Sequence, residues 1–246
     1  MKKDKAAVVY PRKKVIRTIL TTGINVALFL LGKIRIVGKE NLPQSGPLIV
    51  VGNHFSFLDP LALIKLFSWK LEFLGGTRAP NAPKIVDWFR WVWGIIPVFR
   101  GSVSRDTFAL SESVLKQGGM LAIFPEGGNW ATVLRPARPG VAFLAARTGA
   151  EILPIGLDGF DTFFSNIRKF QRPVATINIG APVGPFEIDL KDRANRDQLN
   201  RIGHEIMLEI AALIPPEKRG YYSDDEAIRE AARGTEVYPW ENVQES

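Results

Sequence analysis

Short apolar runs alternate along this chain with amphipathic segments of helical periodicity. Most of the runs are bounded by Gly, Pro or Asn, which is typical of strands. We expect strands at Ile34–Val37, Leu48–Gly52, Leu71–Leu74, Ile95–Phe99, Met120–Phe124, Ile152–Leu157 and Ala175–Ile179. We expect helices between them at Leu61–Trp69, Lys84–Trp93, Arg105–Gln117 and Val141–Thr148. Continuous apolar strands alternating with helices predict an α/β fold, with a mainly parallel sheet flanked by helices.

Another helical pattern lies near the C-terminus, where apolar residues recur at steps of three and four and stop before Pro215-Pro216. These residues are Leu199, Ile202, Ile206, Ile210 and Leu213. His204 lies off this apolar stripe, so we expect it to be a solvated surface residue. The run Ser223–Glu226 has the pattern of a capping box that starts a small polar helix. We therefore place the α/β domain at residues 34–215 and a polar C-terminal extension, with a weakly ordered tail, at residues 216–246.

Residues 1–33 combine a basic arm with an apolar stretch. Within residues 1–20 the basic residues are Lys2, Lys3, Lys5, Arg12, Lys13, Lys14 and Arg17, and Asp4 is the acidic residue among them. The stretch Ile19–Leu31 is uncharged but interrupted by Thr, Gly and Asn, whereas a spanning helix needs about 20 apolar residues. No small-residue cleavage site follows Leu31, which argues against a signal peptide. The pattern predicts a basic amphipathic segment on an anionic membrane surface, making the protein peripheral or monotopic on the cytoplasmic face.

Composition narrows the classes of function. The 246 residues, 46% of them hydrophobic, suffice for one substantial core. The net charge of +7 would also suit nucleic acid, but recognition motifs for nucleic acid are absent and aromatic residues are not interleaved with the basic arm. The absence of cysteine excludes disulfides, thiol nucleophiles and Cys-based metal sites. The two histidines are 150 residues apart, which argues against a His-based zinc site.

The segment Trp88–Phe99 carries three tryptophans, Trp88, Trp91 and Trp93. A place in the core, the wall of an acyl-chain groove and a membrane-facing ledge all fit this composition. The sequence leaves these three interpretations open.

The run Asn53–Asp59, NHFSFLD, places a base and a carboxylate five residues apart between a predicted strand and a predicted helix. If His54 takes a proton from an alcohol, Asp59 can fix the imidazole tautomer and stabilise the imidazolium. Asp59 before Pro60 also fits an ordinary helix N-cap, and His54 alone fits a satisfied loop histidine. Glu126 follows another strand end, so His54 and Glu126 are expected to face one crevice at the carboxyl edge of the sheet.

Four blocks occur in order along the chain. They are NHFSFLD at 53–59, GIIPVFRGS at 94–102, FPEGGNW at 124–130 and ILPIGLDG at 152–159. Together they resemble the glycerol-phosphate and lysophosphatidate acyltransferase family, whose members esterify a lipid alcohol from acyl-CoA or acyl-carrier protein. The resemblance covers about residues 35–185.

This resemblance implies roles for individual residues. His54 would deprotonate the acceptor hydroxyl, and Asp59 would orient His54. Arg100 at the end of the second block would bind the acceptor phosphate, because an arginine fork matches phosphate oxygens. In the third block Glu126 and Gly127, with Gly128 beside them, would shape the acceptor site. The fourth block, with Pro154, would pack the sheet and line the acyl groove.

The chain departs from the family in the third block, which usually reads FPEGTRS. Gly128-Asn129-Trp130 replaces Thr-Arg-Ser, so the second phosphate-binding arginine is missing. Arg135 and Arg138 follow closely and are candidates to replace it. The acceptor therefore stays open among 1-acyl-glycerol 3-phosphate, glycerol 3-phosphate, another lysophospholipid and a different lipid alcohol.

The implied reaction is direct attack of the hydroxyl on a thioester carbonyl, with loss of the thiol. No metal or redox cofactor is needed, because the acyl thioester on CoA or acyl-carrier protein is a substrate. The oxyanion needs preorganised donors, which the sequence does not identify. The chain has no G-x-S-x-G elbow and no G-x-x-x-x-G-K-[ST] loop. The non-enzymatic alternative is a lipid-binding homologue that has lost activity; the altered third block favours it, and intact His54 and Asp59 oppose it.

Overall fold

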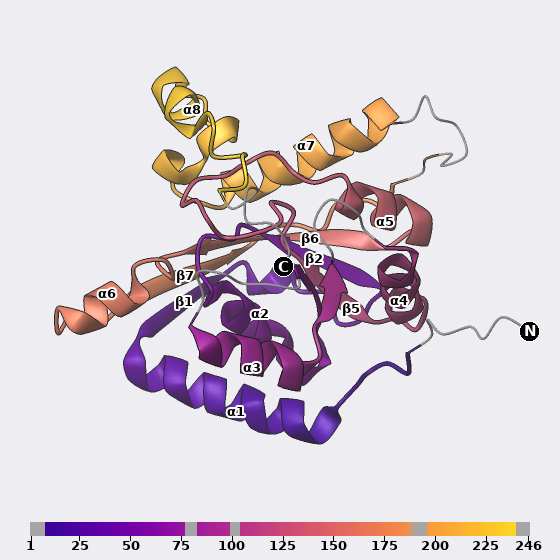
Figure 1. Cartoon of the computed structure of the whole chain (residues 1–246), viewed down its shortest axis with the longest axis horizontal. Helices are drawn as coiled ribbons and strands as arrows, with labels where there is room; N and C mark the ends of the chain where they lie inside the picture. The colour runs from indigo at the N-terminus through magenta and orange to yellow at the C-terminus, as the bar shows by residue number, and fades with distance from the viewer. Residues whose placement is uncertain (1–7, 77–82, 99–103, 187, 189–195, 240–246) are drawn as a thin grey trace, which may run out of the picture.

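A seven-stranded sheet forms the middle layer of the molecule (Figure 1). The computed structural model describes residues 8–76, 83–98, 104–186, 188 and 196–239. The strands are β1 (Lys33–Val37), β2 (Leu48–Gly52), β3 (Glu72–Gly76), β4 (Ile96–Val98), β5 (Met120–Ile123), β6 (Glu151–Asp158) and β7 (Val174–Ile179). Their order across the sheet is β1-β7-β6-β2-β5-β3-β4.

The prediction of a mainly parallel sheet is confirmed. Strands β6, β2, β5, β3 and β4 run parallel to one another. Strand β7 pairs antiparallel with β6, and β1 pairs parallel with β7. The two strands at this edge, β1 and β7, therefore run opposite to the other five strands, which the apolar pattern did not predict.

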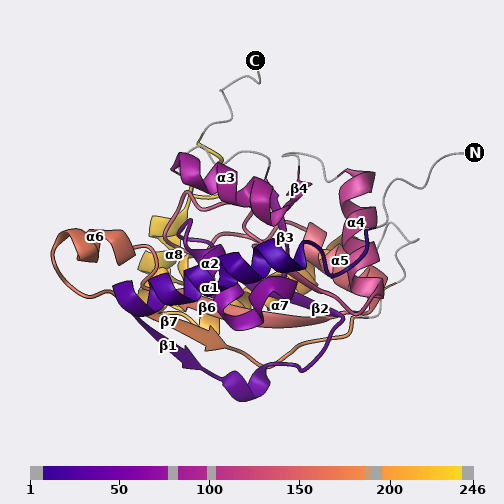
Figure 2. The same cartoon turned by 90° about the horizontal axis from the view of Figure 1, so that it is seen from below.

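Helices cover the sheet on both faces (Figures 1 and 2). One face carries α1 (Lys14–Leu31), α2 (Asp59–Phe67) and α3 (Lys84–Trp93), and the other carries α4 (Arg105–Lys116), α5 (Gly140–Thr148) and α7 (Arg196–Ala212). The short helices α6 (Phe163–Arg168) and α8 (Glu226–Ala232) complete the fold. The predicted helices and strands agree with the described bounds to within three residues, whereas α6 was not predicted and Phe99 lies outside the described residues.

Central strand β2 shows why its apolar run is continuous. Leu48 and Val50 join the core on one face of the sheet, and Ile49 and Val51 join the core on the other. All four side chains are buried. Because successive side chains of a strand point to opposite faces, a strand covered by helices on both sides needs apolar residues at every position.

Helix α1 is tied to the sheet by a buried ion pair. The Arg17 side chain is fully buried, and its Nη1 and Nη2 donate to the two carboxylate oxygens of Glu72 at 2.8 and 2.9 Å. Arg12 donates to the same carboxylate, and Arg17 also donates to the Trp93 carbonyl. Burial by itself raises the pKa of Glu72, but the hydrogen bonds from Arg17 and Arg12 outweigh it and hold that pKa below its ordinary value.

Part of the basic arm has an internal role that the sequence did not predict, and Lys2, Lys3 and Lys5 lie outside the described residues. Arg12 and Arg17 neutralise an internal carboxylate, and Lys13 donates to the carbonyls of Trp91 and Val92 at the end of α3. The physical reason is that Glu72, in a strand covered by helices, needs a counter-charge that the sequence pattern did not reveal.

The outward side of α1 exposes apolar side chains, and α3, which contacts α1, exposes others. We call this set the α1–α3 apolar face; its most exposed members are Val15, Ile19, Phe29, Leu30, Ile85 and Trp91. Within the described ranges α1 is the helix long and apolar enough to cross a membrane, with a mean hydropathy of 1.5 and 17% of its residues buried. Of the α3 tryptophans, Trp93 is buried in the core, which is one of the three interpretations, whereas Trp91 is 78% exposed. The acyl-chain groove and the membrane-facing ledge stay predictions.

The polar C-terminal extension packs against the protein as far as it is described. Two 3-10 turns, Pro216–Lys218 and Gly220–Tyr222, precede α8, and Leu134 in the loop after β5 accepts a hydrogen bond from Tyr221. The predicted helix is confirmed, but its N-cap is Asp225, whose side chain accepts from the Ala227 amide. The expectation of a weakly ordered tail after this helix stays a prediction, and residues 240–246 lie outside the described residues.

We expect Arg17→Ala to lower the free energy of unfolding by about 3–5 kcal/mol, because it leaves the Glu72 carboxylate buried with less counter-charge. Urea unfolding followed by circular dichroism measures this. Lys14→Ala is the matched control: Lys14 is exposed on the same helix and lies over the Trp69 ring, a contact worth about 0.5–1 kcal/mol. Equal effects of the two substitutions would contradict the structural role of the buried pair.

Candidate active site

Strand register brings the first and third sequence blocks together. Val51 of β2 pairs with Ile123 of the parallel strand β5. His54 lies three residues after Val51, and Glu126 lies three residues after Ile123, so both are in loops at the same edge of the sheet. His54 and Glu126 therefore lie together at the carboxyl edge, as expected, and the His54 amide donates to Glu126 Oε1 at 2.8 Å. The crevice that both were expected to face stays a prediction.

The His54 ring is held by Asp59 and Phe124. Nδ1 of His54 lies 3.0 Å from Asp59 Oδ2, and the imidazole stacks on the Phe124 ring at a centroid distance of 4.1 Å. A carboxylate at Nδ1 favours the tautomer that carries its proton there, which leaves Nε2 as the basic nitrogen. The His54 side chain is 16% exposed, so it remains accessible from solvent.

Asp59 does not act as the N-cap that its sequence context suggested. It is the first residue of α2, and its Oδ2 accepts from the Phe55 and Ser56 amides at 2.8 and 2.7 Å. These amides belong to the loop before the helix, so the carboxylate closes that loop around His54. Burial raises the pKa of Asp59, and the hydrogen bonds from His54 and the two amides oppose this effect.

Glu126 is a buried link inside the protein. Its Oε1 accepts from the His54 amide, and its Oε2 accepts from the backbone and the Nε of Arg135, each at 3.2 Å. Burial raises the pKa of Glu126 to about 7, although the Arg135 charge and both amides lower it. The carboxylate thus holds the backbone of His54 from inside the protein. Its predicted role in shaping the acceptor site stays a prediction.

Asn53 is a supporting residue to which the sequence analysis gave no role. Its side-chain amide donates to the Leu157 carbonyl at 2.8 Å and accepts from the Leu157 amide at 2.7 Å. Asn53 is completely buried. This pair of bonds joins the end of β2 to the end of β6 immediately before His54. An asparagine directly after an apolar strand was the available signal, but only the sheet order names its partner.

The remaining predicted site residues have different positions. Gly127 is exposed with φ +80°, a backbone conformation that suits glycine, and Gly128 is half-buried beside Trp130. Arg138 is exposed and lies against Gly127, since a Cβ there would be 3.5 Å from Arg138 Cγ. Arg100 lies outside the described residues. His204 is exposed on α7, as predicted.

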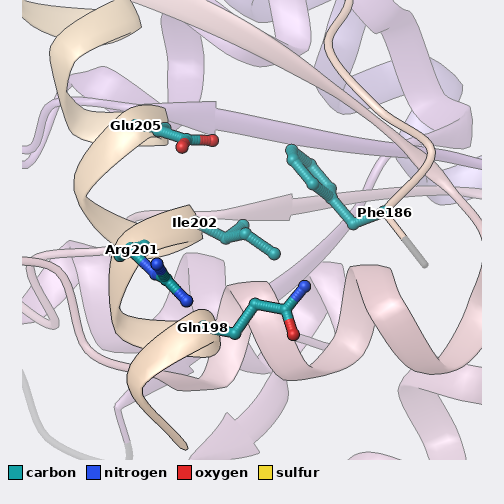
Figure 3. A pocket seen from close by; sticks show the side chains of 5 residues that line it. All are labelled: Phe186, Gln198, Arg201, Ile202 and Glu205. Atoms are coloured by element: carbon teal, nitrogen blue, oxygen red, sulfur yellow. The ribbon is translucent and has the colours of Figure 1, made fainter. Parts of the chain in front are cut away.

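A separate hollow of about 390 Å³ lies beside α7 (Figure 3). It is lined by Phe186, Gln198, Arg201, Ile202 and Glu205. None of the residues gathered around His54 contributes to it, so the hollow is distinct from the candidate site.

A family model described as Acyltransferase matches residues 33–158. This match spans β1 to β6 and includes the loops that carry His54, Asp59 and Glu126. The chain belongs to this acyltransferase family.

Relatives with assigned names agree with this placement. A 1-acyl-sn-glycerol-3-phosphate acyltransferase of Borreliella burgdorferi is 33% identical over 145 residues, which are 57% of this chain and 58% of that protein. The chloroplastic LPAT1 of Arabidopsis thaliana, another 1-acyl-sn-glycerol-3-phosphate acyltransferase, is 32% identical over 60% of this chain and 42% of its own length. The chain thus spans about half the length of these relatives.

The fold also matches a solved structure. The crystal structure of the 1-acyl-sn-glycerophosphate acyltransferase PlsC from Thermotoga maritima superposes with a TM-score of 0.55 and 22% identity, over 80% of this chain and 79% of that one. This likeness establishes the shared α/β architecture.

The raised pKa of Glu126 predicts a pH dependence of stability. Because the folded protein holds this proton more tightly than the unfolded chain does, stability should fall as the pH rises from about 4.5 to about 7, by up to about 3 kcal/mol. Glu126→Gln should remove this component of the slope, whatever its absolute stability. Urea unfolding at several pH values measures the slope, with Glu209→Gln on the exposed side of α7 as control. An unchanged slope in Glu126→Gln would contradict the shift.

Proposed function

We propose that this chain is an O-acyltransferase that moves a fatty acyl group from an acyl thioester to the hydroxyl of a lysophospholipid, with 1-acyl-glycerol 3-phosphate as the preferred acceptor. The observation that carries the proposal is the 3.0 Å contact between His54 Nδ1 and Asp59 Oδ2 at the carboxyl edge of the sheet. Membership of the acyltransferase family supports the same reaction class.

The chemistry follows from the tautomer that Asp59 favours. Nε2 of His54 accepts the proton of the acceptor hydroxyl while the oxygen attacks the thioester carbonyl. The tetrahedral intermediate collapses with cleavage of the C–S bond, and the imidazolium returns its proton to the departing thiolate. Asp59 stabilises the imidazolium between these two steps. The reaction balances with acyl-CoA or acyl-carrier protein as donor substrate and needs no cofactor.

The proposed acceptor carries a phosphate. The names of the relatives support 1-acyl-glycerol 3-phosphate. The exposed Arg138 beside Gly127 supplies a positive charge near the site, and Arg100 is the predicted phosphate ligand. Asn129 in place of the family arginine favours a second candidate, a lipid alcohol without a phosphomonoester. An acceptor panel that includes both kinds of molecule separates these two candidates.

We also propose that the protein is held on the cytoplasmic face of a membrane by the α1–α3 apolar face. Exposed apolar patches of this kind mark interaction surfaces. Because the inner side of α1 packs on the core through Arg17, Thr21 and Leu28, the helix would lie along the surface instead of crossing the bilayer. Lysines near the face add attraction to anionic headgroups.

We expect His54→Ala to reduce acyl transfer by about 10²–10⁴-fold while leaving the fold intact, because it removes the general base. Asp59→Asn should also lose most of the activity, since it weakens the orientation of the imidazole. Release of free thiol from an acyl thioester, with the acceptor panel, measures the rate. His204→Ala, which changes the other histidine, is the matched control and should retain normal activity. Near-normal turnover of His54→Ala would refute the mechanism.

We expect Ile19→Glu combined with Phe29→Glu to abolish binding to vesicles that contain an anionic phospholipid, because both side chains are well exposed on α1. Co-sedimentation measures the bound fraction. Leu208→Glu, an exposed leucine on α7 across the sheet, should bind like the parent. Deletion of α1 is not an equivalent test, since it removes the partner of Glu72. Full binding by the double variant would eliminate this face as the membrane contact.

A further inference from the structure

The C-terminal segment, residues 216–239, returns to the loop that carries the third sequence block. The Leu134 amide donates to the Lys218 carbonyl at 2.9 Å, and the Tyr221 amide donates to the Leu134 carbonyl at 3.2 Å. Gly220 has φ +49°, and a Cβ at this position would overlap the Leu134 carbonyl. Leu134 itself is fully buried. The C-terminal segment is thus joined to this loop backbone to backbone.

The C-terminal segment also contacts Trp130, one of the residues at which the third block departs from the family pattern. Its Nε1 donates to the Thr235 carbonyl at 2.7 Å, and its ring meets Tyr238 edge-on at a centroid distance of 5.3 Å. The guanidinium carbon of Arg135 lies 3.7 Å from the centre of the same ring. A cation over an indole is attracted by the ring electrons. Trp130 therefore connects the C-terminal segment to Arg135.

Arg135 links Trp130 to the loop between β2 and α2 that carries His54, which we call the catalytic loop. Its side chain is 1% exposed, its Nε bonds to Glu126 Oε2 at 3.2 Å, and its Nη2 donates to the Gly128 carbonyl. Glu126 in turn accepts from the amide of His54. A guanidinium that is buried and balanced by a carboxylate is not available to bind an acceptor phosphate. Arg135 is therefore a positioning residue and does not replace the missing family arginine.

Lys218 binds the C-terminal segment to the end of β6 and the loop after it, on the other side of the catalytic loop. Its Nζ contacts Asp158 at 2.8 Å and Asp161 at 3.0 Å. Asp158 ends β6, the strand that Asn53 clamps to β2. The C-terminal segment therefore contacts the loop after β5 and the end of β6, and these two strands flank β2 in the sheet.

We propose that the C-terminal segment is a positioning element of the catalytic centre, which acts through Trp130, Arg135 and Glu126 on the backbone of His54. The proposal rests on the proposed acyl transfer for its kinetic consequence, but its structural link exists independently of any substrate. Releasing Trp130 should let Arg135 and Glu126 relax and shift the His54 loop. A misplacement of about 1 Å at a reacting group costs about 10²-fold in rate.

The structural link can be read directly because the chain has two histidines. Labelling the untagged full-length protein with ¹⁵N-histidine gives two backbone amide signals, one from His54 and an internal reference from His204 on α7. We expect Trp130→Ala to move or broaden the His54 signal and leave the His204 signal in place. Trp130→Phe retains a ring for Arg135 but loses the hydrogen bond to Thr235, so it should give a smaller change in the same direction.

The kinetic arm uses the same variants. We expect Trp130→Ala to lower kcat by about 10- to 100-fold, with the KM for the acyl thioester changed by less than about 2-fold. Trp130→Phe should recover part of kcat. Arg233→Ala is the matched control on the same segment, because Arg233 is exposed and pairs with its neighbour Glu230; it should behave like the parent in both arms.

The outcomes separate this proposal from the proposed function. A His54 amide signal that is unchanged in Trp130→Phe and Trp130→Ala would overturn the positioning role, as would a change in thioester KM without a change in kcat. If Trp130→Ala does not fold, Trp130→Phe decides alone. A parent protein that transfers no acyl group to any acceptor would overturn the proposed function, and the His54 signal would still decide whether the C-terminal segment is coupled to the catalytic loop.

Discussion

A carboxylate removed from water must be balanced by hydrogen-bond donors or by a counter-charge, and this requirement organises the molecule. Glu126 meets it with the His54 amide and the Arg135 side chain, and Asp59 meets it with His54 and two loop amides. Both carboxylates are buried, so the loop that carries His54 is held from two sides. The His54 side chain itself remains partly exposed, which the proposed reaction with an external lipid requires.

Glu72 meets the same requirement far from the candidate site, with Arg17 and Arg12. The two systems are alike, because in each a buried arginine neutralises a carboxylate supplied by the central sheet or its loops. In the Glu72 system, Arg17 ties α1 to the sheet, so the α1–α3 apolar face keeps a fixed position relative to the core. Membrane contact and catalysis would thus be parts of one rigid arrangement.

The sequence predicted the order of elements well because the central strands are apolar on both faces and the helices between them are amphipathic. It also placed His54 and Glu126 at one edge, since parallel strands share a carboxyl edge. It could not predict the reversal of β7, because direction depends on the path of the chain between strands. It assigned no role to Asn53 or Trp130 and named Arg135 only as a candidate to replace the missing arginine. Their partners, at Leu157, Thr235 and Glu126, are distant in the chain or defined only by burial.

The contact between Trp130 and the Thr235 carbonyl also bears on how the protein matures during synthesis. Chains leave the ribosome N-terminus first and fold as sufficient sequence emerges. The residues that pair Arg17 with Glu72 emerge early, and all seven strands have emerged by Ile179. The support behind His54 is complete only after Thr235 has left the ribosome. A nascent chain would therefore complete α1 and the sheet well before the loop that carries His54 has all of its supporting contacts.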